Sequence, residues 1–153
     1  STSGSPLLKE EAMDSLKTLL FPRATLLTPN IPEAELLTGK RITSVADQEE
    51  AAKALYDAYG ASVLVKGGHG TGRAVDVFYD GKIHHYEKPM LDNPNTHGTG
   101  CTLSSAIASF LALGLEEAKA VEEAKNYVYE AIADGLDLGR GRGPINHMVR
   151  RNK

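Results

Sequence analysis

The residues with the clearest chemical potential form a short glycine-rich segment, Asn95 to Thr102, that runs directly into apolar residues at helical spacing. The glycines in it let the backbone turn and approach a ligand closely, because no Cβ stands in the way. The first amides of a helix lack intrahelical acceptors, and the helix dipole adds positive potential there. The segment therefore predicts an anion site that suits a phosphate or a phosphoryl group in transfer.

Cys101 lies in the first turn of the predicted helix. The helix dipole and nearby donors favour its thiolate over the thiol, which predicts a base or a nucleophile. Two alternatives stay open at this point. A glycine pair of this kind is often an ordinary strand-to-helix turn, and this one lacks both the P-loop lysine and the third glycine of dinucleotide-binding loops. A lone cysteine is often a small buried hydrophobic residue.

The composition limits the classes of protein to which the chain can belong. It has 153 residues, 41% hydrophobic and 24% charged, as expected of one globular domain or a part of one. A formal net charge of −3 gives no electrostatic basis for binding nucleic acid. No apolar run approaches the roughly 18 residues of a membrane span. The single cysteine excludes an internal disulfide. We therefore expect a cytoplasmic protein without membrane or nucleic-acid partners.

Helical and strand-like segments alternate along the chain. Periodic apolar residues predict helices over residues 9–20, 32–37, 45–59 and 116–133, and Ser44 and Asp47 match a capping box at the start of the third. Another helix is predicted to start at the glycine loop and to carry apolar residues at helical spacing, namely Leu103, Ala106, Ile107, Phe110 and Leu111. Apolar runs predict strands over residues 24–28 and 62–66, and two further strands, 74–79 and 82–87, form a hairpin around Asp80 and Gly81. The first helix is expected to bury Ala12, Met13, Leu16, Leu19 and Leu20. The pattern predicts an α/β fold with a mostly parallel sheet, helices on both faces and a small β-hairpin.

Polar residues follow the two apolar strands. Asn30 and Glu33 come after the first, and Lys66 and Gly68 after the second. Ligands of open α/β sheets bind beyond the carboxyl ends of the strands, so we expect one cleft that also includes the glycine loop. In it Asn30 would contact phosphate and Glu33 would order the water around Mg²⁺. The alternative is that Asn30 caps the next helix and Glu33 complements its dipole.

The histidines predict no metal centre. His84 and His85 are adjacent on a strand and so point to opposite faces, and with one cysteine no structural zinc is expected. His97 is expected to hold the geometry of the glycine loop. His69 is expected either to line the cleft or to lie on the surface, and His147 to belong to a terminal loop.

Four motifs carry a resemblance to a known family. In chain order they are Thr28-Pro29-Asn30-x-x-Glu33, Val65-Lys66-Gly67-Gly68-His69, Asn95-Thr96-His97-Gly98-Thr99-Gly100-Cys101-Thr102-Leu103-Ser104 and Gly143-Pro144-Ile145-Asn146-His147. The chain closely resembles hydroxymethylpyrimidine/phosphomethylpyrimidine kinase of thiamine biosynthesis, in the ribokinase-like superfamily, from about Ser3 onward. Sugar kinases of that superfamily usually have Asp where Cys101 stands. Asp92-Asn93-Pro94 stands where the family pattern has Asp-Thr-Lys.

The resemblance implies a role for each matching residue. The matches are Cys101 for the catalytic base, Gly98, Thr99 and Gly100 for the anion hole, Lys66, Gly68 and Asn30 for nucleotide binding, and Glu33 for Mg²⁺ through water. The reaction of the family uses ATP and Mg²⁺ to phosphorylate 4-amino-5-hydroxymethyl-2-methylpyrimidine and then its monophosphate. The resemblance therefore implies a small-molecule kinase.

The resemblance also implies that residues 1–153 are one part of a longer unit. Members of this family are considerably longer, so we expect the C-terminal, nucleotide and phosphoryl-transfer part of one ribokinase-like domain. An incomplete domain exposes a sheet edge and an apolar seam, which favours a homo-oligomer or pairing with an N-terminal half. Turnover by the isolated chain is not implied, because most acceptor contacts would lie elsewhere. The alternatives are a pyridoxal or related vitamin kinase and a non-catalytic nucleotide-binding module.

Overall fold

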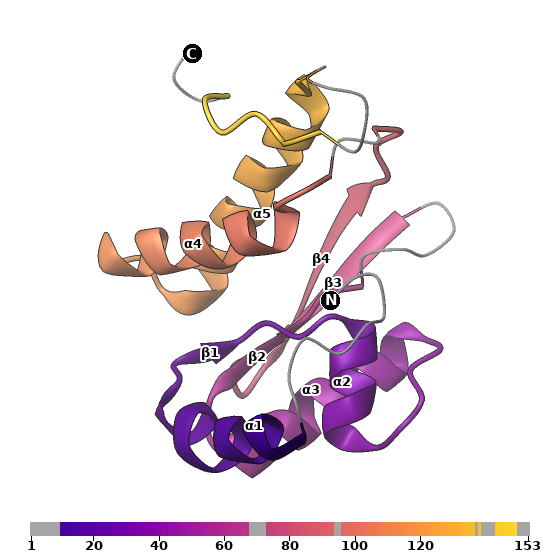
Figure 1. Cartoon of the computed structure of the whole chain (residues 1–153), viewed down its shortest axis with the longest axis vertical. Coiled ribbons are helices and arrows are strands. Elements are labelled where there is room, and N and C mark those ends of the chain that lie inside the picture. Colours follow the sequence, from indigo (N-terminus) through magenta and orange to yellow (C-terminus); the bar gives the residue numbers. More distant parts are fainter. Residues whose placement is uncertain (1–9, 68–72, 94–95, 137, 139–142, 150–153) are drawn as a thin grey trace. The chain divides into compact units, whose positions relative to one another are not determined.

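The structure is a computed structural model that describes residues 10–67, 73–93, 96–136, 138 and 143–149 (Figure 1). The expectations for Gly68 and His69 therefore lie outside the described residues. The chain divides into two compact units, residues 1–87 and residues 88–153. No helix in the described ranges is long and apolar enough to cross a lipid bilayer.

A four-stranded mixed sheet has the strand order β1-β2-β3-β4. Its strands are β1 (Leu26–Leu27), β2 (Ser62–Val65), β3 (Arg73–Tyr79) and β4 (Ile83–Pro89). The first two pair in parallel, whereas β2 and β3 pair antiparallel with Leu64 opposite Phe78. The α/β class and the hairpin are confirmed, but the sheet is mixed rather than mostly parallel. The connection from β2 to β3 is too short for a crossover helix, and so it permits only antiparallel pairing.

The helices of the first unit are close to their predicted positions. They are α1 (Glu10–Ser15), continued by a π-helical turn (Leu16–Leu20) and a 3₁₀ turn (Phe21–Arg23), then α2 (Ile31–Thr38) and α3 (Val45–Tyr59). The prediction that Leu19 and Leu20 are buried is wrong, since they are 62% and 55% exposed. A π turn is wider than an α turn, so it rotates these two residues off the face that holds Met13 and Leu16.

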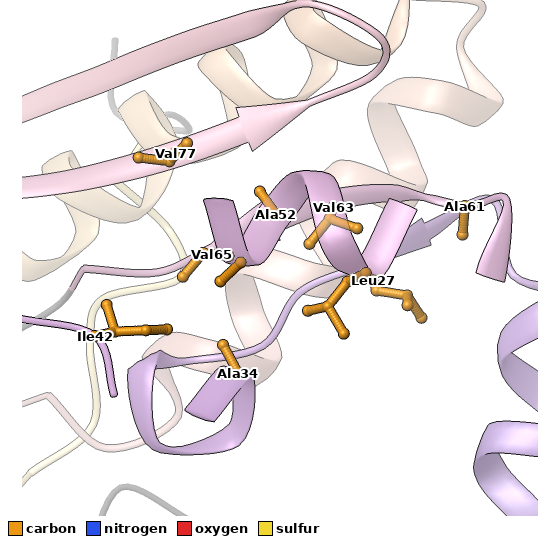
Figure 2. Close-up of a cluster of buried hydrophobic side chains, with 10 residues drawn as sticks. Leu27, Ala34, Ile42, Ala52, Ala61, Val63, Val65 and Val77 are labelled. Atoms are coloured by element: carbon orange, nitrogen blue, oxygen red, sulfur yellow. The ribbon is translucent and has the colours of Figure 1, made fainter. Parts of the chain in front are cut away.

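One hydrophobic cluster lies between the sheet and helices α2 and α3 (Figure 2). Leu27 of β1, Val63 and Val65 of β2, and Val77 of β3 meet Ala52 of α3 there. Every residue of β2 is buried, so its alternate side chains, which point to the opposite face of the sheet, are also shielded from water. This agrees with the expectation from the uninterrupted apolar run. Coverage of both faces by helices stays a prediction.

Two packed helices make up most of the described part of the second unit. They are α4 (Thr99–Ala112) and α5 (Glu117–Asp134). Leu103 and Ile107, two of the apolar residues at helical spacing in α4, are buried, as are Val121 and Val128 of α5. This packing fixes α4 along its length, and its first turn is where the glycine loop ends.

Candidate functional site

Helix α4 begins without a capping side chain. Gly98 is its N-cap residue and has a left-handed backbone conformation with φ of +85°. An L-residue with a Cβ is strained in that region, so glycine is suited to this position. Nothing lies within 4 Å of the place that a Cβ on Gly98 would occupy. The start of the helix is therefore sharp and open.

The hydroxyl groups around this turn bind carbonyls and leave amides uncovered. Thr99 donates from both its amide and its hydroxyl to the Thr96 carbonyl, at 3.3 and 2.7 Å. The amide and hydroxyl of Thr102 both donate to the Gly98 carbonyl at 2.9 Å. Among the described residues, the amides of Gly100 and Cys101 have no acceptor in the protein. Such donors at a helix start suit an anion, and binding of a phosphate at this loop stays a prediction.

Cys101 is exposed at this helix start. The alternative that it is a buried hydrophobic residue is therefore wrong. It lines a cleft of about 670 Å³, whose other lining residues include Gly98, Thr102, Ser105, Tyr127 and His147. The thiol, the open amides and the cleft belong to one compact unit, so this arrangement is internal to residues 88–153. The group can bind an anion and present a sulfur atom beside it.

A segment near the end of the described chain holds the loop from the other side. His97 pairs with Pro144 in a parallel β-bridge, and its amide donates to the Gly143 carbonyl at 3.3 Å. The expectation that His97 holds the loop geometry is confirmed, although it acts through its backbone. Sequence reasoning missed that His147 lines the cleft, and the only signal was that its motif accompanies the glycine loop in the resemblance.

Asn30 and Glu33 form a capping box at the start of α2. The Asn30 side chain accepts from the Glu33 amide at 2.9 Å, and the Glu33 carboxylate accepts from the Asn30 amide at 2.8 Å. The structural alternative for this pair is therefore confirmed as its present arrangement. No group of three or more acidic, histidine or cysteine residues that could hold a metal occurs within the described ranges. One carboxylate still fits Mg²⁺, which is commonly held by substrate phosphates, water and one or two carboxylates.

The carboxyl ends of β1 and β2 bring Asn30 beside Lys66. These two residues form a parallel bridge, and the Lys66 amide donates to the Pro29 carbonyl at 2.9 Å. The predicted proximity of the two strand ends is confirmed. Asn30, Glu33 and Lys66 lie in the first unit, whereas the residues of the glycine loop lie in the second. The single cleft that would join them stays a prediction.

Gly67 has a structural role that sequence reasoning missed. A Cβ on Gly67 would lie 1.8 Å from the Val75 carbonyl oxygen, so β3 leaves no room for a side chain. Its amide donates to the Asp76 carboxylate at 2.8 Å, and Asp76 is only 7% exposed. Apart from the adjacent pair of glycines, no signal in the sequence pointed to this contact. The amide is occupied by the protein, unlike those of Gly100 and Cys101.

His84 and His85 have separate partners. The Nε2 atom of His84 lies 3.2 Å from the Asp80 carboxylate, and that of His85 lies 2.9 Å from the Glu49 carboxylate. These separate partners agree with the prediction that the two adjacent side chains point to opposite faces of the strand.

Comparison with known proteins places this geometry in a family. The sequence model of the protein family described as phosphomethylpyrimidine kinase matches residues 1–146 of this chain. The chain belongs to the phosphomethylpyrimidine kinase family. A hydroxymethylpyrimidine/phosphomethylpyrimidine kinase of Streptomyces coelicolor is 47% identical over 149 residues, which cover 96% of this chain and 55% of that protein. The chain thus spans about half the length of this phosphomethylpyrimidine kinase relative.

Solved structures of two kinases share the fold. An ADP complex of Bacillus subtilis pyridoxal kinase aligns with a TM-score of 0.88 and 38% identity, covering 97% of this chain and 57% of that one. A phosphomethylpyrimidine kinase of Clostridium difficile 630 aligns with a TM-score of 0.73 and 43% identity, covering 86% and 53%. The ribokinase-like fold expected for the phosphomethylpyrimidine kinase family is therefore confirmed.

Proposed function

We propose that this chain is the phosphoryl-transfer part of a kinase that uses ATP and Mg²⁺ to phosphorylate 4-amino-5-hydroxymethyl-2-methylpyrimidine and then its monophosphate, in thiamine diphosphate biosynthesis. Membership of the phosphomethylpyrimidine kinase family supports the reaction class. The observation that carries the proposal is the start of α4, where two amides that have no acceptor among the described residues stand beside an exposed thiol.

The proposed chemistry assigns two tasks to this helix start. The sulfur of Cys101 acts as the base that takes the proton of the acceptor hydroxyl while that oxygen attacks the γ-phosphorus of ATP. The bond from the γ-phosphorus to the β,γ-bridging oxygen breaks, and ADP leaves. The amides of Gly100 and Cys101, with the loop from Gly98 to Thr99, stabilise negative charge on the transferred group. Fixed donors at a helix start suit this task because they need no reorganisation during the transfer.

The residues of the first unit are assigned to the nucleotide and its metal. Lys66, Gly68 and Asn30 are proposed to lie along the nucleotide, and Glu33 to hold water of Mg²⁺. The bound metal would neutralise charge on the β- and γ-phosphates. The capping box supports this in one respect, because it fixes the Glu33 carboxylate at the end of β1. The protein is proposed to act in the cytoplasm, as a homo-oligomer or paired with an N-terminal half.

The proposal is tested by binding and by turnover. Titration of this chain with ATP should give Mg²⁺-dependent binding, detected as altered amide resonances at Gly100 and Cys101. For turnover, the chain replaces the matched 55% of the Streptomyces coelicolor relative in a chimera. The chimera should phosphorylate the pyrimidine alcohol. If ATP leaves the loop resonances unchanged and the chimera folds but is inactive, the chain is not a phosphoryl-transfer module.

A pyridoxal kinase is the second candidate. The observation that favours it is the TM-score of 0.88 with the Bacillus subtilis pyridoxal kinase, which exceeds the 0.73 found for the phosphomethylpyrimidine kinase. The two acceptors are distinguished by comparing kcat/KM for the pyrimidine alcohol and for pyridoxal. Because the acceptor contacts of a chimera come partly from the relative, the decisive comparison uses a second chimera built on the Bacillus subtilis pyridoxal kinase.

A further inference from the structure

The motif Gly143 to His147 has no role in the chemistry above, yet it is tied to the glycine loop. His97 donates from its amide to the Gly143 carbonyl and forms a β-bridge with Pro144. Ile145 is fully buried, which anchors the motif against the protein. The backbone of the loop thus depends on where this short segment lies.

The segment is in turn fixed to the last turn of α5. The last four carbonyls of a helix lack intrahelical donors. The Asn146 amide donates to the Ala131 carbonyl at 3.0 Å, and the Asn93 side chain donates to the Ile132 carbonyl at 2.6 Å. Two segments, one before and one after the glycine loop in the sequence, therefore supply donors to two of the last four carbonyls of α5. That end serves as the anchor for the loop.

Asn146 makes the most contacts in this arrangement. Its side-chain amide donates to the Asp134 carboxylate, and its side-chain oxygen accepts from the Met148 amide at 2.9 Å. The adjacent His147 carbonyl accepts from the Tyr127 hydroxyl at 2.8 Å. A hydrogen bond to a charged group is stronger than a neutral one, so the link to Asp134 adds to the restraint that the buried Ile145 places on the segment.

We propose that Asn146 is a positioning residue for the phosphoryl-transfer loop. Through Asp134 and the end of α5 it fixes the segment Gly143–His147, and that segment holds His97 so that the amides of Gly100 and Cys101 point to the anion. The same restraint keeps His147 at the wall of the cleft that Cys101 lines. The proposal deepens the proposed function and rests on it for the identity of the ligand, which is MgATP.

The test uses two readouts on the whole chain, neither of which needs turnover. The first is hydrogen exchange of the His97 amide, with the Val121 amide in the middle of α5 as an internal reference for global unfolding. The second is the concentration of MgATP that protects Cys101 from iodoacetamide, which is unambiguous because the chain has one cysteine. Asn146→Ala should raise both the His97 exchange rate and the protecting concentration by about tenfold, as for loss of a hydrogen bond to a charged group. Exchange at Val121 should not change.

If Asn146→Ala does not fold, a second set of variants, in which the residue types at positions 146 and 134 are exchanged, tests the same proposal. Asn146→Asp places two carboxylates opposite each other and should resemble the alanine variant. In the double variant Asn146→Asp with Asp134→Asn, the side chain at position 134 donates and the side chain at position 146 accepts. The His97 exchange rate and the protecting concentration of MgATP should then return to near the wild-type values. Lys119→Ala, which removes an exposed ion pair with Glu122 on the same helix, is the control and should change neither.

The outcomes separate this proposal from the proposed function. If MgATP fails to protect Cys101 in the wild-type chain, the proposed function fails, and His97 exchange alone decides whether Asn146 positions the loop. If wild-type protection is seen but Asn146→Ala leaves it unchanged, or leaves His97 exchange unchanged, Asn146 is not a positioning residue. Failure of the exchanged pair to restore either readout contradicts the role of Asp134.

Discussion

Two helix starts in this chain have opposite designs. At α2, Asn30 and Glu33 cover the first amides with side-chain oxygens in a reciprocal capping box. At α4, Gly98 has no side chain to offer, and the nearby hydroxyls of Thr99 and Thr102 bind carbonyls instead. At the first helix start, side chains therefore accept from the amides of Asn30 and Glu33, whereas at the second no acceptor for the amides of Gly100 and Cys101 is found among the described residues.

The difference shows what each helix start contributes. An N-cap side chain stabilises a helix by about 1 kcal/mol, so leaving it out has a thermodynamic cost. In α4 that cost is offset by the packing of Leu103 and Ile107 against the rest of the unit, where both are buried. Packing of side chains along α4 thus stabilises the helix, and its first turn is the part that is available to bind a ligand. Substitutions at the two starts should therefore change different quantities.

The largest expected effect is on chemistry at the open start. In the chimera, Cys101→Ala should lower kcat by at least about 100-fold, the lower range for loss of a general base. The melting temperature should hardly change, because the side chain is exposed and its removal leaves no cavity. Turnover is measured with the pyrimidine alcohol at saturating ATP. Turnover equal to that of the parent chimera would remove Cys101 from the mechanism and leave the open amides as an anion site only.

The next largest effect is expected at Gly67, whose amide donates to the Asp76 carboxylate within the protein. Gly67→Ala would place a Cβ 1.8 Å from the Val75 carbonyl oxygen, so β2 and β3 must separate locally. Overpacking of this kind typically costs about 1–3 kcal/mol, and a backbone obstacle should put it at the upper end. Urea denaturation measures the loss of unfolding free energy. A loss below about 0.5 kcal/mol, within the range of ordinary surface substitutions, would show that this strand pair is not tightly packed.

The features predicted from sequence are those that depend on neighbouring residues. The capping box of Ser44 and Asp47 is a local pattern, and α3 begins there with both hydrogen bonds in place. The tight turn into α4 also follows from a short motif, because its glycines allow the backbone to turn, whereas the sequence left open whether Cys101 is buried or exposed. Two features required tertiary contacts and were not predicted. They are the approach of Val75 to Gly67 and the link from Asn146 to Asp134.

Two glycines with the same backbone strain separate stability from binding. Gly98 and Gly39 have φ of +85° and +70°, and nothing lies within 4 Å of a Cβ added to either. Alanine at each position should therefore cost a similar 1–2 kcal/mol, roughly the penalty of a left-handed residue. Only Gly98→Ala should also weaken binding of MgATP, because Gly39 ends the closed helix α2. Calorimetric titration of both variants decides this, and equal ATP affinities would contradict an anion site at Gly98.

The smallest expected effect is a change in pH dependence at the other closed helix start, that of α3. The Asp47 carboxylate accepts from the Thr43 amide and hydroxyl and from the Ser44 amide, at 2.8, 2.9 and 2.9 Å. The hydrogen bond from the Thr43 amide is the largest cause that lowers the pKa of Asp47 below 3.8, followed by the side-chain bonds. Because the pKa of Asp47 is lower in the folded state, the unfolded chain binds more protons than the folded chain in the acid range. The Asp47 carboxylate therefore stabilises the fold above pH 3.8, and this stabilisation is lost as the pH falls through the pKa of the folded state.

Removing the charge of Asp47 should therefore make the free energy of unfolding depend less on pH in the acid range, and it should not change ligand binding at the start of α4. Asp47→Asn should reduce the slope of unfolding free energy against pH in the acid range below 3.8, and Thr43→Val, which removes only the hydroxyl donor, should reduce it less. Urea titrations at successive pH values measure the slope. Binding of MgATP at neutral pH should be the same in both variants as in the wild-type chain, because this capping box belongs to α3 and not to the helix start that is proposed to bind the anion. A weaker affinity in Asp47→Asn would mean that closed and open helix starts are coupled, and the division between stabilising and binding ends of helices would no longer describe this protein.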